Sequence, residues 1–223
     1  MIKILQLILV VFIFSGGNAI AKIKLDDDSK KLSTYKKCAS SKKGPVDSMP
    51  AQFASDNDLT RNEGGFFNSY NQKIIIRGII KDKNCVPVSN ANVKLWQVDS
   101  YGKVRYETQR MTKKEKYDQD KIIYSDFQGT GMFTSLNNGE FFFITVMPSE
   151  LSKSAHSPKY INLQINHDDF PKLSNKIYFL ETAQFSNKDN VIIAKNYFST
   201  EFKDIKIYDT EIILDGVSIH NQF

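Results

Sequence analysis

Side chains that could carry acid–base or metal chemistry are sparse in this sequence. The 223 residues include three histidines, His156, His167 and His220, whose spacing matches no recurring set of metal ligands. An exposed loop histidine is the simplest interpretation of His156. The sequence signatures of phosphate-binding loops, dinucleotide-binding folds, zinc proteases and serine hydrolases are all missing. The sequence therefore gives no support for the reactions that depend on those motifs.

The most distinctive pattern is a framework of motifs between Lys73 and Glu181. Its parts are an isoleucine-rich strand, Val86-Pro87-Val88, Ala91-x-Val93, Leu95-Trp96-Gln97 and Phe127-Gln128-Gly129-Thr130-Gly131. This framework resembles the intradiol ring-cleavage dioxygenases of the protocatechuate and catechol type. The Val-Pro-Val and Ala-x-Val parts also occur in transthyretin-like sandwiches, so the later two motifs carry most of the specificity.

The resemblance implies a set of four metal-ligand positions. Members of the family hold a ferric ion with two tyrosines and two histidines, and the matching positions here are Val104, Leu151, Tyr160 and Asn162. Two of these side chains are aliphatic and have no lone pair to donate. Tyr160 and Asn162 keep the alternate spacing of a His-x-His pair on one strand face but lack the imidazoles. We therefore expect no catalytic residue, no bound metal and no cofactor, although the family uses ferric iron.

Two alternatives stay open at this point. The first is an active iron-dependent dioxygenase with a displaced metal site, for which the available ligands are Tyr106, Tyr160, His156 and His167. Tyr106 could replace Val104 only if the register slipped by two residues, since both would then face the same side of a strand. The second is a transthyretin-like or carbohydrate-associated sandwich unrelated to dioxygenases.

Short strands must position these residues. Strands are predicted at 73–81, 91–98, 103–107, 131–135, 140–146, 159–166, 176–180 and 205–214, with a surface loop at 108–121 and a short helix at 190–198. Asn138-Gly139 predicts a hairpin between its flanking strands, because both turn residues tolerate positive φ. This pattern is typical of an all-β fold, a β-sandwich of about eight short, mostly antiparallel strands with long loops and an extended N-terminal tail.

The N-terminus is expected to direct export. In residues 1–21, Lys3 precedes the apolar stretch from Ile4 to Phe14, and Ala19-Ile20-Ala21 fits the cleavage rule for signal peptides. The apolar stretch is shorter than the roughly 20 residues that span a bilayer. Residues 22–62 form a polar tail, extended along the domain or partly disordered, and residues 63–220 form the sandwich. The mature protein is expected in the periplasm or secreted, with no stable membrane span; an uncleaved membrane anchor is the alternative.

The two cysteines are also relevant to the expected export. Cys38 and Cys85 are the only cysteines, and in an exported chain they predict one disulfide, the alternative being two separate thiols. The formal net charge is +5, with lysines scattered among acidic residues. Such a surface is typical of a solvated protein and not of one that binds nucleic acid.

We therefore expect an exported, non-catalytic member of the dioxygenase fold that acts as a binding or interaction module. Its partner is an unknown small molecule or protein, and a homo-oligomer is compatible with the sequence. In the run Phe141-Phe142-Phe143, one face is expected in the core. Phe142 would then point outward, where it is a candidate for partner contact.

Overall fold

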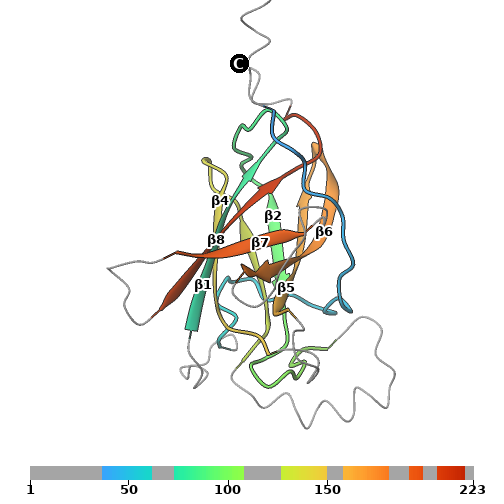
Figure 1. Cartoon of the computed structure of the whole chain (residues 1–223). Helices are drawn as coiled ribbons and strands as arrows, with labels where there is room; N and C mark the ends of the chain where they lie inside the picture. Colours follow the sequence, from blue (N-terminus) through green and yellow to red (C-terminus); the bar gives the residue numbers. More distant parts are fainter. Residues whose placement is uncertain are drawn as a thin grey trace, which may run out of the picture. The chain divides into compact units, whose positions relative to one another are not determined.

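The computed structural model describes residues 37–61, 73–107, 127–149, 158–180, 191–197 and 205–218. These residues belong to one compact unit, Lys36–Phe223. The strands are β1 (Lys73–Lys81), β2 (Asn92–Trp96), β3 (Thr130–Thr134), β4 (Glu140–Val146), β5 (Tyr160–His167), β6 (Phe170–Phe179), β7 (Ile192–Tyr197) and β8 (Lys206–Ile213) (Figure 1). No helix in the described part of the chain is long and apolar enough to cross a membrane.

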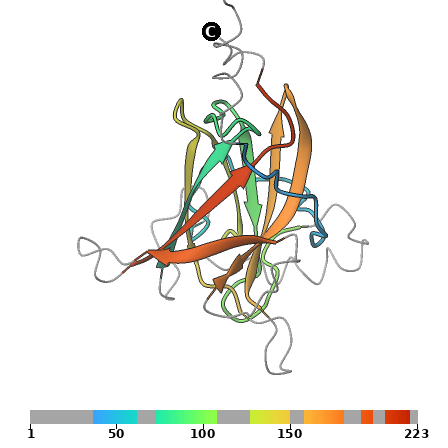
Figure 2. The ribbon, with the colours of Figure 1, turned by 45° about the horizontal axis from the view of Figure 1, so that its top comes forward.

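The eight strands form two facing layers. Their hydrogen-bonded order is β3-β2-β5-β6-β7-β8-β1-β4, with β1–β8 and β6–β7 parallel and the other pairs antiparallel. β7 pairs with β6 on one side and β8 on the other, so it joins the two layers, as Figure 2 shows. The predicted all-β sandwich, mostly antiparallel, is confirmed.

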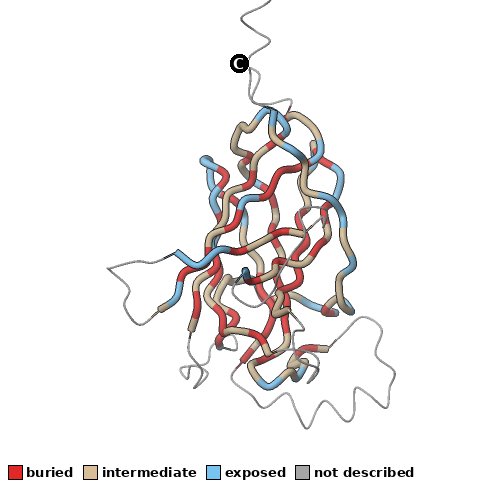
Figure 3. Tube along the Cα trace, viewed as in Figure 1, coloured by how far each residue is buried: buried red, intermediate tan, exposed pale blue. Residues whose placement is uncertain are grey.

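The core lies between the layers because apolar residues alternate along the strands. Ile74, Ile76 and Ile80 of β1 are buried and share one core with Val93 and Leu95 of β2. Figure 3 shows the buried residues distributed along the strands of both layers, with exposed residues mostly in the turns and loops. Each fully buried side chain of this size contributes about 2 kcal/mol to stability.

The N-terminal segment 37–61 is part of the sandwich. It is extended, and Cys38 near its start is joined to Cys85 by a disulfide, the pair named from the sequence. At its other end Leu59 is fully buried, donating its N–H to Ile144 O (2.9 Å) of β4 and accepting from Gln128 N (3.0 Å) just before β3. The segment thus closes the gap between the two terminal strands of the sheet, and the structured unit begins before residue 63.

The predicted hairpin is wrong in its pairing. The turn itself forms: Gly139 has a φ of 76° and donates its N–H to Leu136 O at 2.8 Å. β3 and β4, however, stand at opposite ends of the strand order and pair with β2 and β1. The turn therefore carries the chain from one layer to the other. This pairing is determined by strands distant in the sequence and not by the turn itself.

The predicted helix at 190–198 is also wrong, because this stretch contains strand β7. Ile192 and Ala194 are buried while Lys195 and Tyr197 are exposed. Its backbone groups are satisfied by β6 and β8, which lie far apart in the sequence. The predicted strand at 176–180 is longer than expected, since β6 begins at Phe170.

The predicted strand at 103–107 is a loop organised by Asp99. The Asp99 carboxylate accepts from the N–H groups of Tyr101 (2.8 Å) and Lys103 (2.9 Å). It also pairs with Arg105 Nε at 2.7 Å. These bonds satisfy the backbone locally, so the segment has no need of a neighbouring strand. The predicted loop at 108–121 and the signal peptide lie outside the described residues.

Candidate functional site

Tyr160 and Asn162 lie on the same face of β5 and meet a carboxylate from the N-terminal segment. Asp47 accepts hydrogen bonds from Tyr160 Oη (2.9 Å) and Asn162 Nδ2 (3.2 Å). The Asp47 N–H donates to Asn162 Oδ1 at 2.9 Å. Asn162 Nδ2 also donates to Trp96 O of β2, at 3.2 Å. The β-strand alternation therefore brings the two family positions together, and Asp47 joins them.

A lysine completes this group of side chains. Lys176 on β6 is the register partner of Asn162, and its Nζ lies 3.0 Å from Asp47 Oδ1. The same ammonium lies 3.8 Å from the centroid of the Tyr160 ring, a favourable cation–π arrangement. The Lys176 side chain is only 13% exposed. We call Asp47, Tyr160, Asn162 and Lys176 the Asp47 cluster; it contains its own positive charge.

Two further tyrosines lie near the Asp47 cluster. Burial raises the pKa of Tyr106, and the charge of Asp47 and the neighbouring Tyr160 raise it further. Burial, followed by the charge of Asp47, also raises the pKa of Tyr160 and of Tyr178, whose rings are 5.6 Å apart. All three phenols therefore stay protonated to a higher pH than an ordinary tyrosine does.

Tyr106 approaches the Asp47 cluster because the neighbouring chain makes room for it. A side chain on Gly129 would lie 3.2 Å from the Tyr106 ring and 3.1 Å from that of Phe127. Gly129 also has a φ of 71°, which favours glycine. Val104, the position inferred from the resemblance, is a half-buried residue of the Asp99 loop. The tyrosine two residues later thus reaches the electrostatic neighbourhood of Tyr160.

The Trp-Gln motif connects the two layers beneath this region. Gln97 Nε2 donates to Val146 O at 2.9 Å, and Thr145 Oγ1 donates to Gln97 Oε1 at 2.9 Å. Both partners belong to β4 in the opposite layer. Trp96 is fully buried, with its ring 5.7 Å from that of Phe53 in an edge-to-face contact. The motif therefore links the two layers beneath the Asp47 cluster.

His167 does not join the Asp47 cluster. His167 lies at the other end of β5, where Nε2 contacts Ser89 O (3.1 Å) and Nδ1 accepts from Asp169 N (3.1 Å). Both of its ring nitrogens are thus used within the fold. Leu151, His156 and His220 lie outside the described residues.

The residues of this region do not fit a ferric ion held by two tyrosinates and two imidazoles. At the positions that the resemblance gives for the imidazoles this chain has Tyr160 and Asn162, and Val104, inferred for a tyrosine position, offers no donor atom. The Lys176 ammonium already balances the charge of Asp47, so no net negative charge is left to hold a trivalent cation. The described part of the chain also contains no group of three or more His, Cys, Asp or Glu residues that could hold a metal.

Sequence reasoning missed Asp47 and Lys176. Asp47 lies in a polar segment with no periodicity, and 115 residues separate it from Asn162. Lys176 is one of many lysines scattered along the chain. The spacing of Tyr160 and Asn162 gave the one local signal, since it predicted that the two side chains point to the same side.

The fold and the motifs around this region indicate a protein of the intradiol dioxygenase class. A family model described as Dioxygenase matches residues 43–213, and the chain belongs to the intradiol ring-cleavage dioxygenase family. The "Putative dioxygenase" of Rickettsia typhi is 34% identical over 171 residues, covering 76% of this chain and 79% of that protein. The Burkholderia cepacia protocatechuate 3,4-dioxygenase beta chain is 26% identical over 178 residues, covering 72% of each.

Another relative and two solved structures are also similar to this chain. A Rickettsia bellii protein, also named "Putative dioxygenase", is 37% identical over 131 residues, which is 59% of this chain and 61% of that protein. Among solved structures, catechol 1,2-dioxygenase from Pseudomonas arvilla C-1 superposes with a TM-score of 0.56 at 15% identity, covering 88% of this chain and 69% of that one. An intradiol ring-cleavage dioxygenase from Tetranychus urticae gives 0.54 at 14% identity, covering 82% and 98%. These structures share the fold.

Proposed function

We propose that this chain is an exported, non-catalytic member of the intradiol dioxygenase family that acts as a binding or interaction module. The observation that carries the proposal is the Asp47 cluster. In the family the metal performs the chemistry, and the protein supplies binding and orientation. Here the ligand positions at Tyr160 and Asn162 are bonded to Asp47, and Lys176 supplies the positive charge.

The contacts of the cluster support a stable arrangement without a metal. Buried and half-buried charges are tolerated when they are paired and hydrogen-bonded. Asp47 meets both conditions through Lys176, Tyr160 and Asn162. The raised pKa values of Tyr106 and Tyr160 oppose formation of the tyrosinates that ferric iron prefers. Each polar side-chain group of the Asp47 cluster therefore has a partner without an ion.

Metal content and oxygen uptake test the non-catalytic role. Protein purified from iron-replete cells should be colourless, contain far less than stoichiometric iron, and consume no oxygen with catechol. An active catechol 1,2-dioxygenase assayed in parallel is the positive control. Stoichiometric ferric iron with visible tyrosinate colour and catechol-dependent oxygen uptake would contradict the proposal. The active alternative would then hold, with Tyr106 and Tyr160 as the first ligands to test.

Export is supported by the N-terminal sequence pattern and by the disulfide. A Cys38–Cys85 bridge suits an oxidising compartment, where disulfides persist. Mass spectrometry of the protein from its native cells should find a chain beginning at Lys22, in the periplasm or the medium. Full-length protein with Met1 retained in the cytosol would contradict export without bearing on the missing chemistry.

A further inference from the structure

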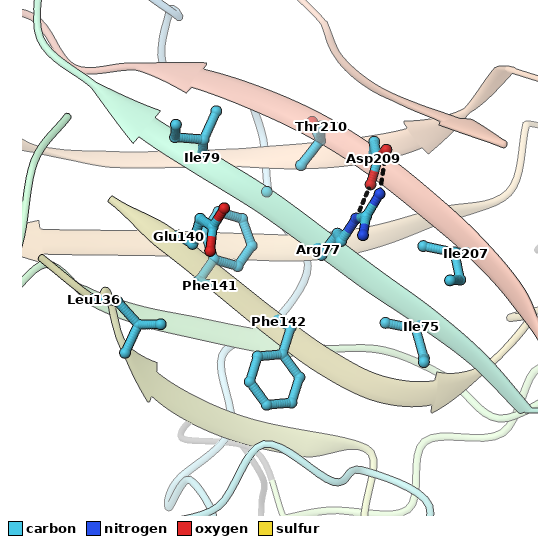
Figure 4. A pocket seen from close by; sticks show the side chains of 11 residues that line it. Ile75, Arg77, Ile79, Leu136, Glu140, Phe141, Phe142, Ile207, Asp209 and Thr210 are labelled. Carbon is cyan, nitrogen blue, oxygen red and sulfur yellow. Dashed lines mark hydrogen bonds and ion pairs between the residues drawn. The ribbon is translucent and has the colours of Figure 1, made fainter. Parts of the chain in front are cut away.

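A hollow lies on the outer face of the β4-β1-β8 layer, away from the core. It has a volume of about 610 Å³ and its lining includes Ile75, Ile79, Leu136, Phe142 and Ile207 (Figure 4). The register explains why it is apolar, since Ile75 is the cross-strand partner of Ile207. Phe142 is 42% exposed and Leu136 49% exposed. The volume is within the usual range for small-molecule sites, and we call this hollow the β1 groove.

The centre of the β1 groove holds a fixed ion pair. Arg77 Nε and Nη2 contact the two carboxylate oxygens of Asp209 at 2.5 and 3.0 Å. The Arg77 guanidinium also lies 4.8 Å from the centroid of the Tyr197 ring. These bidentate and stacking contacts hold the pair in one geometry and neutralise both charges. The pair therefore adds polarity to the groove but no net charge.

Glu140 gives the β1 groove its net charge. Its side chain is exposed at the start of β4, opposite Ile79, and lines the groove beside Leu136 and Phe142. Among the described residues, no Lys or Arg forms an ion pair with Glu140, although its charge adds to the raised pKa of Arg77, after the larger effect of Asp209. The nearby Lys81 pairs with Glu211 instead. With Arg77 and Asp209 balanced, the charged residues of the lining sum to one negative charge.

We propose that the β1 groove binds an amphiphilic organic cation, a single ammonium group on an apolar body. The ammonium would lie at Glu140 against the Phe142 ring, where carboxylate and aromatic face attract a cation together. The apolar body would cover the isoleucines of β1 and β8. The proposal rests on the proposed function, because it names a ligand class for a binding module. The β1 groove and the Asp47 cluster are separate sites with no residue in common.

Calorimetric titration with three probes of equal length tests the proposal. Hexyltrimethylammonium carries the predicted charge, hexanol none, and hexanesulfonate the opposite charge. We expect the ammonium compound to bind at least about threefold more tightly than hexanol, since partly exposed charge pairs contribute modestly. Hexanesulfonate should bind most weakly. Glu140→Gln should remove the preference for the cation, and Phe142→Ala should weaken the binding of all probes.

A matched control and a second measurement keep the outcome clear. Asp168→Asn changes the net charge equally at an exposed residue outside the groove, and it should leave the cation preference intact. Equal binding of the three probes, or unchanged preference in Glu140→Gln, would overturn the proposal. So would a concentration-dependent dimer abolished by Phe142→Ala, because a second copy would then occupy the groove. Iron analysis of the same samples tests the proposed function separately. Stoichiometric iron would contradict the proposed function, whereas iron-free protein without a cation preference would contradict only this inference.

Discussion

The carboxylate of Asp47 determines the electrostatics around Tyr160. It contacts three side chains from two strands, and its charge raises the pKa of Tyr106, Tyr160 and Tyr178 after the larger effect of burial on each. In the folded protein these phenols keep their protons at a pH where unfolded tyrosines ionise. A single residue of the N-terminal segment therefore contributes to how the whole chain responds to alkali.

The free energy of unfolding should fall as the pH rises above about 10. The pKa of each phenol is higher in the folded than in the unfolded state, so the folded chain binds more protons there and stability declines with pH. The buried Tyr106 should contribute about 1.4 kcal/mol per pH unit. The more exposed Tyr160 and Tyr178 should contribute less because solvent screens them. Urea unfolding at a series of alkaline pH values measures this slope.

Asp47→Asn should reduce the alkaline loss of stability. The amide keeps an oxygen that can accept from Tyr160 while removing the charge that opposes phenolate formation. Absorbance titration of the folded variant should therefore show tyrosines ionising at lower pH than in the original chain. Asp168→Asn, an exposed change in the turn at the other end of β5, is the control. If the two variants titrate alike, Asp47 does not act on these tyrosines.

Strand positions follow from local alternation, whereas pairings between distant segments do not. The isoleucines of β1 and the apolar face of β5 made those strands predictable. β7 has too few core residues to show a period, since only Ile192 and Ala194 are buried by its neighbours. The Asn138-Gly139 turn was predictable as a turn. That the turn links the two layers could not be predicted, because it follows from the pairing of β3 with β2 and of β4 with β1.

The closure of the sheet by segment 37–61 depends on a glycine in β3. A side chain on Gly131 would lie 2.8 Å from both Asp56 O and Leu59 Cδ1. We expect Gly131→Ala to push this segment away from β3 and to destabilise the fold by about 1–3 kcal/mol, as overpacking does. Urea unfolding measures the loss, and hydrogen exchange should show faster opening at the Leu59 amide, which bonds Ile144 O.

Thr134→Ala provides the control for that substitution. Thr134 is an exposed residue on the same strand, and its loss should change stability by less than about 0.5 kcal/mol. An alanine at Gly131 that leaves both stability and the Leu59 amide unchanged would show that the segment adapts without cost, and its closing role would then be unsupported.

At the scale of the molecule, the contacts that hold the N-terminal segment on the sandwich also place Asp47 beside Tyr160 and Asn162. The segment is fixed by the disulfide at Cys38, by Gly44 N donating to Ser174 O (2.8 Å), and by Asn175 Nδ2 donating to Lys42 O (2.7 Å). Asp47 follows directly. The sequence indicated a polar tail here, because every anchoring contact reaches residues far along the chain. The family resemblance predicted the sandwich, but it did not predict that Asp47 would contact Tyr160 and Asn162.

Removing the disulfide should therefore weaken both the fold and the Asp47 cluster. The bridge closes a loop with a sequence separation of 47, for which the chain-entropy relation gives about 4 kcal/mol of stabilisation. The double variant Cys38→Ser, Cys85→Ser should lose stability on this scale in urea unfolding, and limited proteolysis should cut within residues 37–47 first. Wild-type protein kept reduced is the matched control, because it lacks the bridge but retains both side chains. If reduced protein and the double variant unfold like the oxidised chain and resist early cleavage, the hydrogen bonds alone hold the segment, and Asp47 needs no covalent tether to reach Tyr160.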